Sequence, residues 1–269
     1  MKNNNYFFNF ILIVLSYLVS SYIITLFFSD YISIRELSLL QIPFFLLPAI
    51  YLSKHNNISN KINFRLDIKS ILGILWGMAG LSLFFYGWEV LQNSVSQNFL
   101  SDFLSGLREE SEQLQYQLEY NNHNTIFEYI KIILFVSIVP AICEEFLFRG
   151  YLLQSIISKN ENKKIKSVLL SAFLFSFVHF NFISMVPIFI MGIYLAMLAI
   201  STENLLIPIV FHATNNLITI ISINYNHLSE IKIIENTYIG VILFFIGLLV
   251  MYFSYKTTTS KKYLYSNKL

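Results

Sequence analysis

The sequence predicts an all-α polytopic membrane protein built as a bundle of about eight transmembrane helices. Hydrophobic residues make up 55% of the 269 residues and charged residues only 13%, whereas soluble domains average about 45–50% and about 25%. The mean hydropathy is correspondingly high, at +0.59. The apolar residues also fall into runs of about 20, which is the length that crosses the hydrocarbon core of a bilayer.

Eight hydrophobic runs define the expected spans. The first is longer than the core of a signal peptide, which has about 7–15 residues, so we expect it to be retained as a helix. The second contains Pro43 and Pro48, which predict a kink. We find no internal repeat, and we treat residues 1–269 as one membrane domain. In chain order, the runs cover residues of about 6–28, 37–53, 71–91, 126–158, 167–182, 185–200, 205–223 and 238–255.

The segment 92–124 differs from the spans because it is polar, acidic and long. Leucines recur in it at helical spacing opposite acidic residues, which predicts an amphipathic helix on the membrane or on the other helices. A lid over a site and a solvated linker are both compatible with this pattern. We expect the segment to lie on the extracytoplasmic side.

The distribution of lysine and arginine supports the even number of spans. Basic clusters lie between spans two and three, between spans four and five, and after span eight. With eight spans these clusters share one side with Lys2, and basic loops mark the cytoplasmic side. We therefore expect a multi-pass protein of the cell membrane with both termini in the cytoplasm. Abundant Asn, Ile and Lys are typical of an AT-rich bacterial coding sequence.

The net charge and the cysteine content exclude several classes of partner and of cross-link. A formal net charge of only +2 indicates no nucleic-acid partner. The single cysteine, Cys143, excludes an intrachain disulfide and a cysteine-based metal cluster. The composition therefore indicates the lipid bilayer as a partner.

Three ionisable residues organise the chain, because they interrupt a stretch that is otherwise apolar from about 126 to 157. Ionisable side chains at membrane depth are costly and mark functional sites. Glu145 and Arg149 are four residues apart, so they lie on one helix face and can pair. Glu144 points about 100° away from Glu145 and has no partner in its own helix. This geometry makes the pair structural and leaves Glu144 for chemistry.

Two histidines within predicted spans complete the candidate site. At a rise of about 1.5 Å per residue, Glu144 lies roughly 20 Å, His179 roughly 18 Å and His212 roughly 11 Å from the cytoplasmic ends of their spans. All three can therefore share one layer between helices four, five and seven. Phe175 precedes His179 by four residues and can shield or orient it, and Asn216 follows His212 by four. The other histidines fall in predicted loops: His55, His123 and His227.

This set of side chains permits hydrolysis. A carboxylate in a dry pocket can act as a general base on water. Glu144, His179 and His212 together can hold a divalent ion such as zinc and leave one position for water. Asn216 can donate to a developing oxyanion. The sequence lacks the His-Glu-x-x-His pattern of soluble zinc proteases and a serine nucleophile in a Gly-x-Ser-x-Gly setting.

At these residues the sequence resembles the CAAX-protease and bacteriocin-processing family of intramembrane metalloproteases, also called the Abi family. The family pattern places three motifs on separate transmembrane helices. The resemblance covers about 126–223, which we therefore expect to be the catalytic core helices. In this chain the motifs are Glu144-Glu145-x-x-x-Arg149, Phe175-x-x-x-His179 and His212-x-x-x-Asn216.

The resemblance implies an intramembrane endopeptidase that acts on a peptide or protein substrate in the membrane. Glu144 would activate the attacking water, and His179 would assist it or bind metal. His212 and Asn216 would bind metal or stabilise the oxyanion, while the ion pair braces the site. The motifs leave open whether a metal is used.

Two other functions are compatible with the sequence. One is a non-catalytic scaffold or bacteriocin self-immunity protein with the same fold. The other is a transporter that relays protons through intramembrane carboxylates and histidines. The clustering of motifs in one half of the chain, without paired broken helices in both halves, weighs against a transporter.

Overall fold

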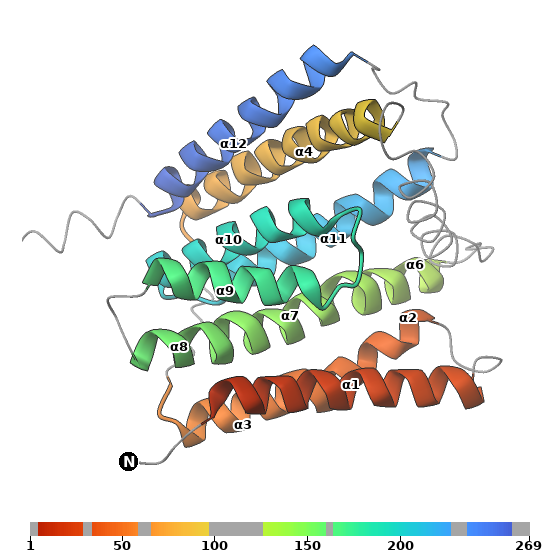
Figure 1. Ribbon diagram of the computed structural model, residues 1–269, viewed down its shortest axis with the longest axis vertical. Helices are drawn as coiled ribbons and strands as arrows, with labels where there is room; N and C mark the ends of the chain where they lie inside the picture. Colours follow the sequence, from red (N-terminus) through yellow and green to blue (C-terminus); the bar gives the residue numbers. More distant parts are fainter. Residues whose placement is uncertain are drawn as a thin grey trace, which may run out of the picture.

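The computed structural model describes residues 5–28, 34–58, 66–96, 126–159, 164–226 and 236–259. Within these ranges every regular element is a helix, and the helices follow the chain in the predicted order (Figure 1). The all-α fold predicted from the apolar runs is therefore confirmed. Each of the eight runs contains a helix, although several of these helices differ from the predicted spans.

The second run forms a rod, called the second rod below, and its helix type changes along its length. Pro43 lies at the start of the π-helical stretch, where its missing N–H group prevents the regular hydrogen-bond ladder from closing. Gln41 lies between the tight 3₁₀ turn and this wide stretch. After α1 (Tyr6–Phe28), the rod consists of α2 (Ile34–Leu37), η1 (Ser38–Leu40), η2 (Ile42–Leu46) and α3 (Leu47–His55).

The helix that carries Glu144 and Glu145 also contains two π-helical stretches, where its turns are wider than those of an α-helix. It continues past Pro140 without a break, and a π-helical stretch directly precedes that proline. The wider turn accommodates the backbone carbonyl that Pro140 cannot satisfy. Its segments are α6 (Ile126–Ile132), η3 (Ile133–Ile138), α7 (Val139–Glu145), η4 (Phe146–Leu153) and α8 (Gln154–Lys159).

The helices of the described chain differ in whether they are long and apolar enough to span a bilayer. Five helical stretches of the described chain are long and apolar enough to cross a membrane: 6–28, 68–94, 126–158, 185–202 and 237–259. A shorter apolar stretch, Leu206–Ser222, lies in α11. The remaining helices are α4 (Ile68–Ser96), α9 (Lys164–Phe177), α10 (Met185–Thr202), α11 (Leu206–Asn226) and α12 (Thr237–Thr259).

Helix α9 ends earlier than the apolar run predicts. The run predicts a helix over 167–182, but α9 ends at Phe177 after 14 residues. The amides of His179 and Phe180 bond three residues back, and Phe180 has a φ of 50°. A left-handed residue of this kind ends an α-helix. His179 therefore lies in the turn after α9 and not within a span.

Helices α4 and α12 lie side by side and antiparallel at one edge of the molecule (Figure 1). Glycines allow this close approach, because a Cβ added at Gly247 would lie 2.5 Å from the Phe84 nitrogen and 2.7 Å from the Gly80 carbonyl oxygen. Helices α10 and α11 contact this pair on its inner side. The helix from Ile126 to Lys159 packs between α3, α9 and α11, so it occupies the centre of the bundle.

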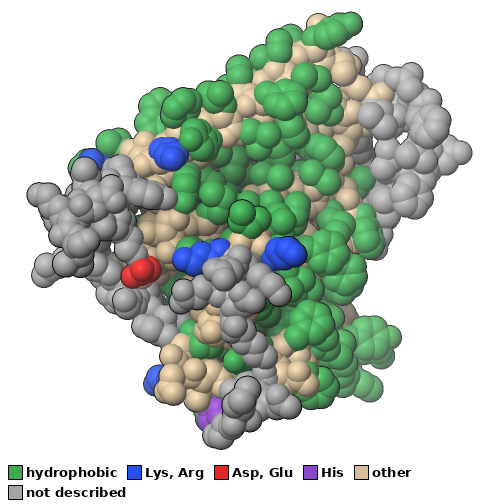
Figure 2. All heavy atoms as spheres, turned by 60° about the vertical axis from the view of Figure 1, so that its left-hand side comes forward, with side chains coloured by type: hydrophobic (Ala, Val, Ile, Leu, Met, Phe, Trp, Pro, Cys, Tyr) green, Lys and Arg blue, Asp and Glu red, His purple; other side chains and the backbone are tan. Residues whose placement is uncertain are grey.

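Lysine side chains gather at one end of the bundle (Figure 2). Lys54 lies in the last turn of α3, Lys164 and Lys166 begin α9, and Lys256 lies in the last turn of α12. The start of α1 lies at this same end (Figure 1). The arrangement agrees with an even number of crossings, while the assignment of this end to the cytoplasm stays a prediction.

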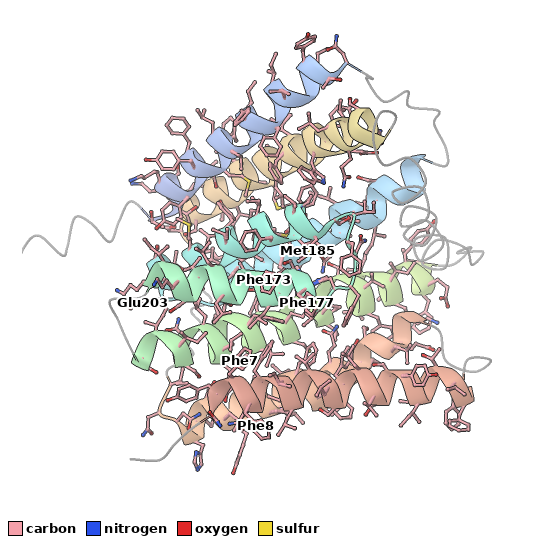
Figure 3. The ribbon with its side chains drawn as sticks, in the orientation of Figure 1. Phe7, Phe8, Phe173, Phe177, Met185 and Glu203 are labelled. Atoms are coloured by element: carbon pink, nitrogen blue, oxygen red, sulfur yellow. The ribbon has the colours of Figure 1, made fainter. Side chains whose placement is uncertain are left out.

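Large apolar side chains cover the sides of the bundle. Figure 3 shows Phe7 and Phe8 of α1 and Phe173 and Phe177 of α9 on one side, and they are between 45% and 54% exposed. Exposed aromatic rings of this size suit contact with lipid chains better than contact with water. The surface is therefore that of a protein embedded in a bilayer.

Some sequence predictions fall outside the described residues. Most of the predicted amphipathic segment 92–124 lies outside the described residues. Only its first residues are described, and they continue α4 to Ser96. His123, His227 and the basic tail after residue 259 also lie outside. These stay predictions.

Replacing Gly247 by alanine is expected to force α4 and α12 apart. The new Cβ meets backbone atoms, which cannot rotate away, so overpacking should cost about 1–3 kcal/mol. Thermal unfolding of the purified protein in detergent measures the loss. The control is Ile246→Ala, at an adjacent position that is 44% exposed. Equal midpoints for the two variants would contradict the close-packing account.

Candidate active site

Two adjacent glutamates end α7, and both are buried. Glu144 is 9% exposed and Glu145 is 0% exposed. Successive helix positions differ by about 100°, so the two carboxylates leave the helix in different directions. Glu145 faces its own helix and α11, whereas Glu144 faces the second rod, α11 and the turn after α9.

The predicted pairing of Glu145 with Arg149 is present. Arg149 Nη1 donates to Glu145 Oε1 at 2.8 Å, and both side chains are fully buried. Nη2 of the same guanidinium donates to the Gly192 carbonyl oxygen at 3.2 Å. The guanidinium carbon also lies 4.2 Å from the centroid of the Phe175 ring. A buried charge is tolerated only with such an opposite charge and hydrogen bonds.

His212 is held by the same carboxylate. Its Nδ1 lies 2.9 Å from Glu145 Oε1, and the residue is 2% exposed. The Phe175 ring packs edge-on against the imidazole at a centroid distance of 5.6 Å. Glu145 therefore fixes both Arg149 and His212, although they lie on different helices.

His179 is held by the helix that precedes it. Its Nδ1 lies 2.6 Å from the carbonyl oxygen of Phe175, and its ring lies 4.8 Å from the Phe175 ring. Phe175 thus contacts His179 in two ways, through its backbone carbonyl and through its ring, and its orienting role stays a prediction. The His179 side chain is 29% exposed, so it is more open than Glu144 or His212.

The carboxylate of Glu144 joins three separate parts of the chain. Its Oε2 lies 3.8 Å from His179 Nε2 and 3.9 Å from His212 Nε2. Its Oε1 accepts a hydrogen bond from Gln41 Nε2 at 3.3 Å. Over the described part of the chain, Oε2 is buried and accepts no hydrogen bond.

The hydrogen bonds of the two imidazoles decide what they present to Glu144. Their Nδ1 atoms face a carbonyl and a carboxylate, which only accept, so each Nδ1 carries the hydrogen. In the neutral ring, Nε2 then holds a lone pair. His179, His212 and Glu144 thus direct three electron-pair donors toward one region.

Two imidazole nitrogens and one carboxylate oxygen are ligand types that bind a divalent metal ion. Metal-binding histidines usually donate their other N–H to a carboxylate or carbonyl group, as both do here. The distances are longer than a bound ion needs, because four-coordinate zinc keeps its ligand atoms about 3.4 Å apart. In line with this, no group of three His, Cys, Asp or Glu side chains among the described residues closes on one ion. Shifts of about half an ångström would bring the Glu144 oxygen to that spacing from each imidazole nitrogen.

The same separations suit a water molecule as they stand. Hydrogen bonds to oxygen span about 2.7–3.2 Å, so a water to the side of the line that joins Glu144 Oε2 to an imidazole Nε2, atoms 3.8 or 3.9 Å apart, can donate to both. Such a water would lie against a carboxylate oxygen with no other hydrogen-bond donor among the described residues. This is the arrangement that general-base hydrolysis requires.

The site includes residues that the motifs did not identify. Gln41 contacts Glu144, and the Gly192 carbonyl contacts Arg149. A buried glutamine in an apolar run just before Pro43 is a polar residue at membrane depth, and that signal could have identified Gln41. A backbone carbonyl gives no such signal. Asn216 lies one turn after His212 and is partly buried, so its role at the oxyanion stays a prediction.

Comparison with known families finds a match that covers the central helices. Residues 126–218 match the family described as Rce1-like, type II CAAX prenyl endopeptidase Rce1-like. The match confirms the resemblance to CAAX proteases predicted from the three motifs, and the matched segment contains all three. No curated protein and no solved structure matches the chain.

Replacing Arg149 by methionine is expected to destabilise the fold strongly. The change leaves the Glu145 carboxylate buried without its counter-charge, which typically costs about 3–5 kcal/mol. Thermal unfolding in detergent measures this loss. Adding Glu145→Gln should recover part of it, because the amide oxygen can still accept from His212 without carrying charge. A double variant no more stable than the single one would contradict this account.

Proposed function

We propose that this chain, whose residues 126–218 match the Rce1-like family, is an intramembrane endopeptidase that uses a water activated by Glu144. The observation that carries the proposal is the meeting of Glu144 Oε2 with the Nε2 atoms of His179 and His212. These residues come from three different elements and have no reason to converge in a bundle stabilised by apolar packing alone. The substrate would be a peptide or protein in the membrane.

In the proposed reaction, Glu144 Oε2 removes a proton from a water held beside the two imidazoles. The water oxygen then attacks the carbonyl carbon of the scissile peptide bond and forms a tetrahedral intermediate. The proton held by Glu144 passes to the leaving nitrogen as the carbon–nitrogen bond breaks. One water is consumed, and a carboxylate and an amine are released.

The negative charge that develops on the carbonyl oxygen needs a donor. Asn216 can supply its side-chain amide from one turn beyond His212 on α11. Glu145 and Arg149 serve the reaction indirectly, because they fix the orientation of His212. Burial of these groups excludes bulk water and strengthens each polar contact.

A metal ion is compatible with this scheme. His179, His212 and Glu144 would hold a divalent ion, and zinc suits two imidazoles and one carboxylate. Such an ion supplies Lewis acidity, which makes water easier to deprotonate and polarises a peptide carbonyl group. The imidazoles are already oriented by Glu145 and the Phe175 carbonyl.

Replacing Glu144 by glutamine is expected to lower the rate of peptide cleavage at least about 10²–10⁴-fold, because the general base is lost. The assay measures cleavage of candidate peptides, prenylated and unprenylated, by the protein purified in detergent. The matched control is Glu128→Gln on the same helical rod, where the half-buried glutamate pairs with Lys131 away from the two histidines.

Equal cleavage by the parent and by Glu144→Gln would rule out the proposed peptidase. A function that survives this change, such as protection of cells against a bacteriocin, would identify a scaffold or immunity protein instead.

Metal analysis tests the second part of the proposal. We expect the parent to retain about one equivalent of a divalent ion after purification without chelators, and His179→Ala to lose most of it, because a histidine whose other ring nitrogen is hydrogen-bonded contributes strongly to metal affinity. His55→Ala is the control, since His55 ends α3 and is exposed. If the parent protein is active but contains no metal, the metal part of the proposal is wrong, and Glu144 activates the water without an ion.

A further inference from the structure

Gln41 is a buried polar residue from a part of the chain that lies outside the segment matched by the family. It is 8% exposed and belongs to the second helical rod. It stands where a 3₁₀ turn gives way to the π-helical stretch that contains Pro43. Changes of helix type of this kind often occur at functional sites, because they redirect individual side chains.

The direction of the Gln41 amide follows from its neighbour. Its nitrogen lies 3.3 Å from Glu144 Oε1. The reversed amide would place its oxygen against a carboxylate oxygen, and two acceptors repel each other. Gln41 therefore donates to Glu144. Over the residues that the structure describes, this is the single hydrogen bond that the Glu144 carboxylate accepts.

We infer that Gln41 is a positioning residue of the peptidase, which holds one oxygen of Glu144 so that the other stays directed at His179 and His212. The inference rests on the proposed function and extends its site to the second rod. A carboxylate on a two-carbon side chain can rotate about three bonds. A donor on Oε1 selects the rotamer in which Oε2 meets both imidazoles at 3.8 and 3.9 Å.

The chemistry of an amide suits this task. An arginine or lysine at this position would pair with Glu144 and weaken it as a base, as Arg149 pairs with Glu145. A neutral N–H donor orients the carboxylate without cancelling its charge. Tyr17 of α1 also lies near both Gln41 and Glu144, so α1 and the second rod both border the site.

The kinetic test compares Gln41→Met with the parent. Methionine has nearly the same length but no hydrogen-bond donor, so we expect kcat to fall 10- to 100-fold while KM changes less than about twofold, since ground-state binding is untouched. The matched control is Gln154→Met, on the helical rod that carries Glu144 but ten positions further along the chain. Parent-like kcat for Gln41→Met would overturn the inference.

A second test needs no activity. Thermal unfolding in detergent is measured for the parent, Gln41→Met, Glu144→Ala and the double variant. If Gln41 serves the carboxylate, its replacement lowers the midpoint in the parent but has little effect once Glu144 is alanine. Equal shifts in both backgrounds would mean that Gln41 only fills space, and this would overturn the inference.

The two tests separate the inference from the function on which it rests. If Glu144→Gln loses cleavage and Gln41→Met does not, the peptidase stands and the positioning role fails. If the parent cleaves no candidate peptide and its function is independent of Glu144, the peptidase fails, and the positioning role fails with it even where the unfolding data show coupling.

Discussion

The site depends on one oxygen atom, Oε1 of Glu145, which accepts hydrogen bonds from Arg149 and from His212. The first bond lies within one helix, and the second ties that helix to α11. Because both glutamate and arginine are fully buried, neither can exchange these partners for water. The contact is costly to form and costly to break, so it fixes where the helix carrying Glu144 lies against α11.

This constraint separates the roles of two adjacent carboxylates. Oε1 of Glu145 contacts both Arg149 and His212, and these two partners hold the carboxylate in place. Glu144, one residue earlier and about 100° around the helix, keeps one oxygen without a hydrogen-bond donor in the described chain. In the proposed reaction, this fixed and charge-paired neighbour supports the carboxylate that activates water. Phe175 serves both sides, since its ring contacts Arg149 and both imidazoles.

The wide helical turns place these groups. One π-helical stretch precedes α7, another follows it, and a third begins just after Gln41. Prolines account for two of them, because Pro43 and Pro140 cannot donate a backbone hydrogen bond. The extra residue in a wide turn rotates the following side chains relative to a regular helix. The close pair of α4 and α12 packs beside α10 and α11 and completes the bundle through glycine contacts.

The sequence by itself determined the all-α fold, the order of the helices, the Glu145–Arg149 pair and the polar residues at membrane depth. These follow from local rules, since apolar length and four-residue spacing act within one helix. Tertiary structure alone decided the end of α9 before His179, the binding of His212 by Glu145 and the contact of Gln41 with Glu144. These depend on how helices distant in the chain pack and rotate against each other, and neither hydrophobic runs nor residue spacing records that rotation.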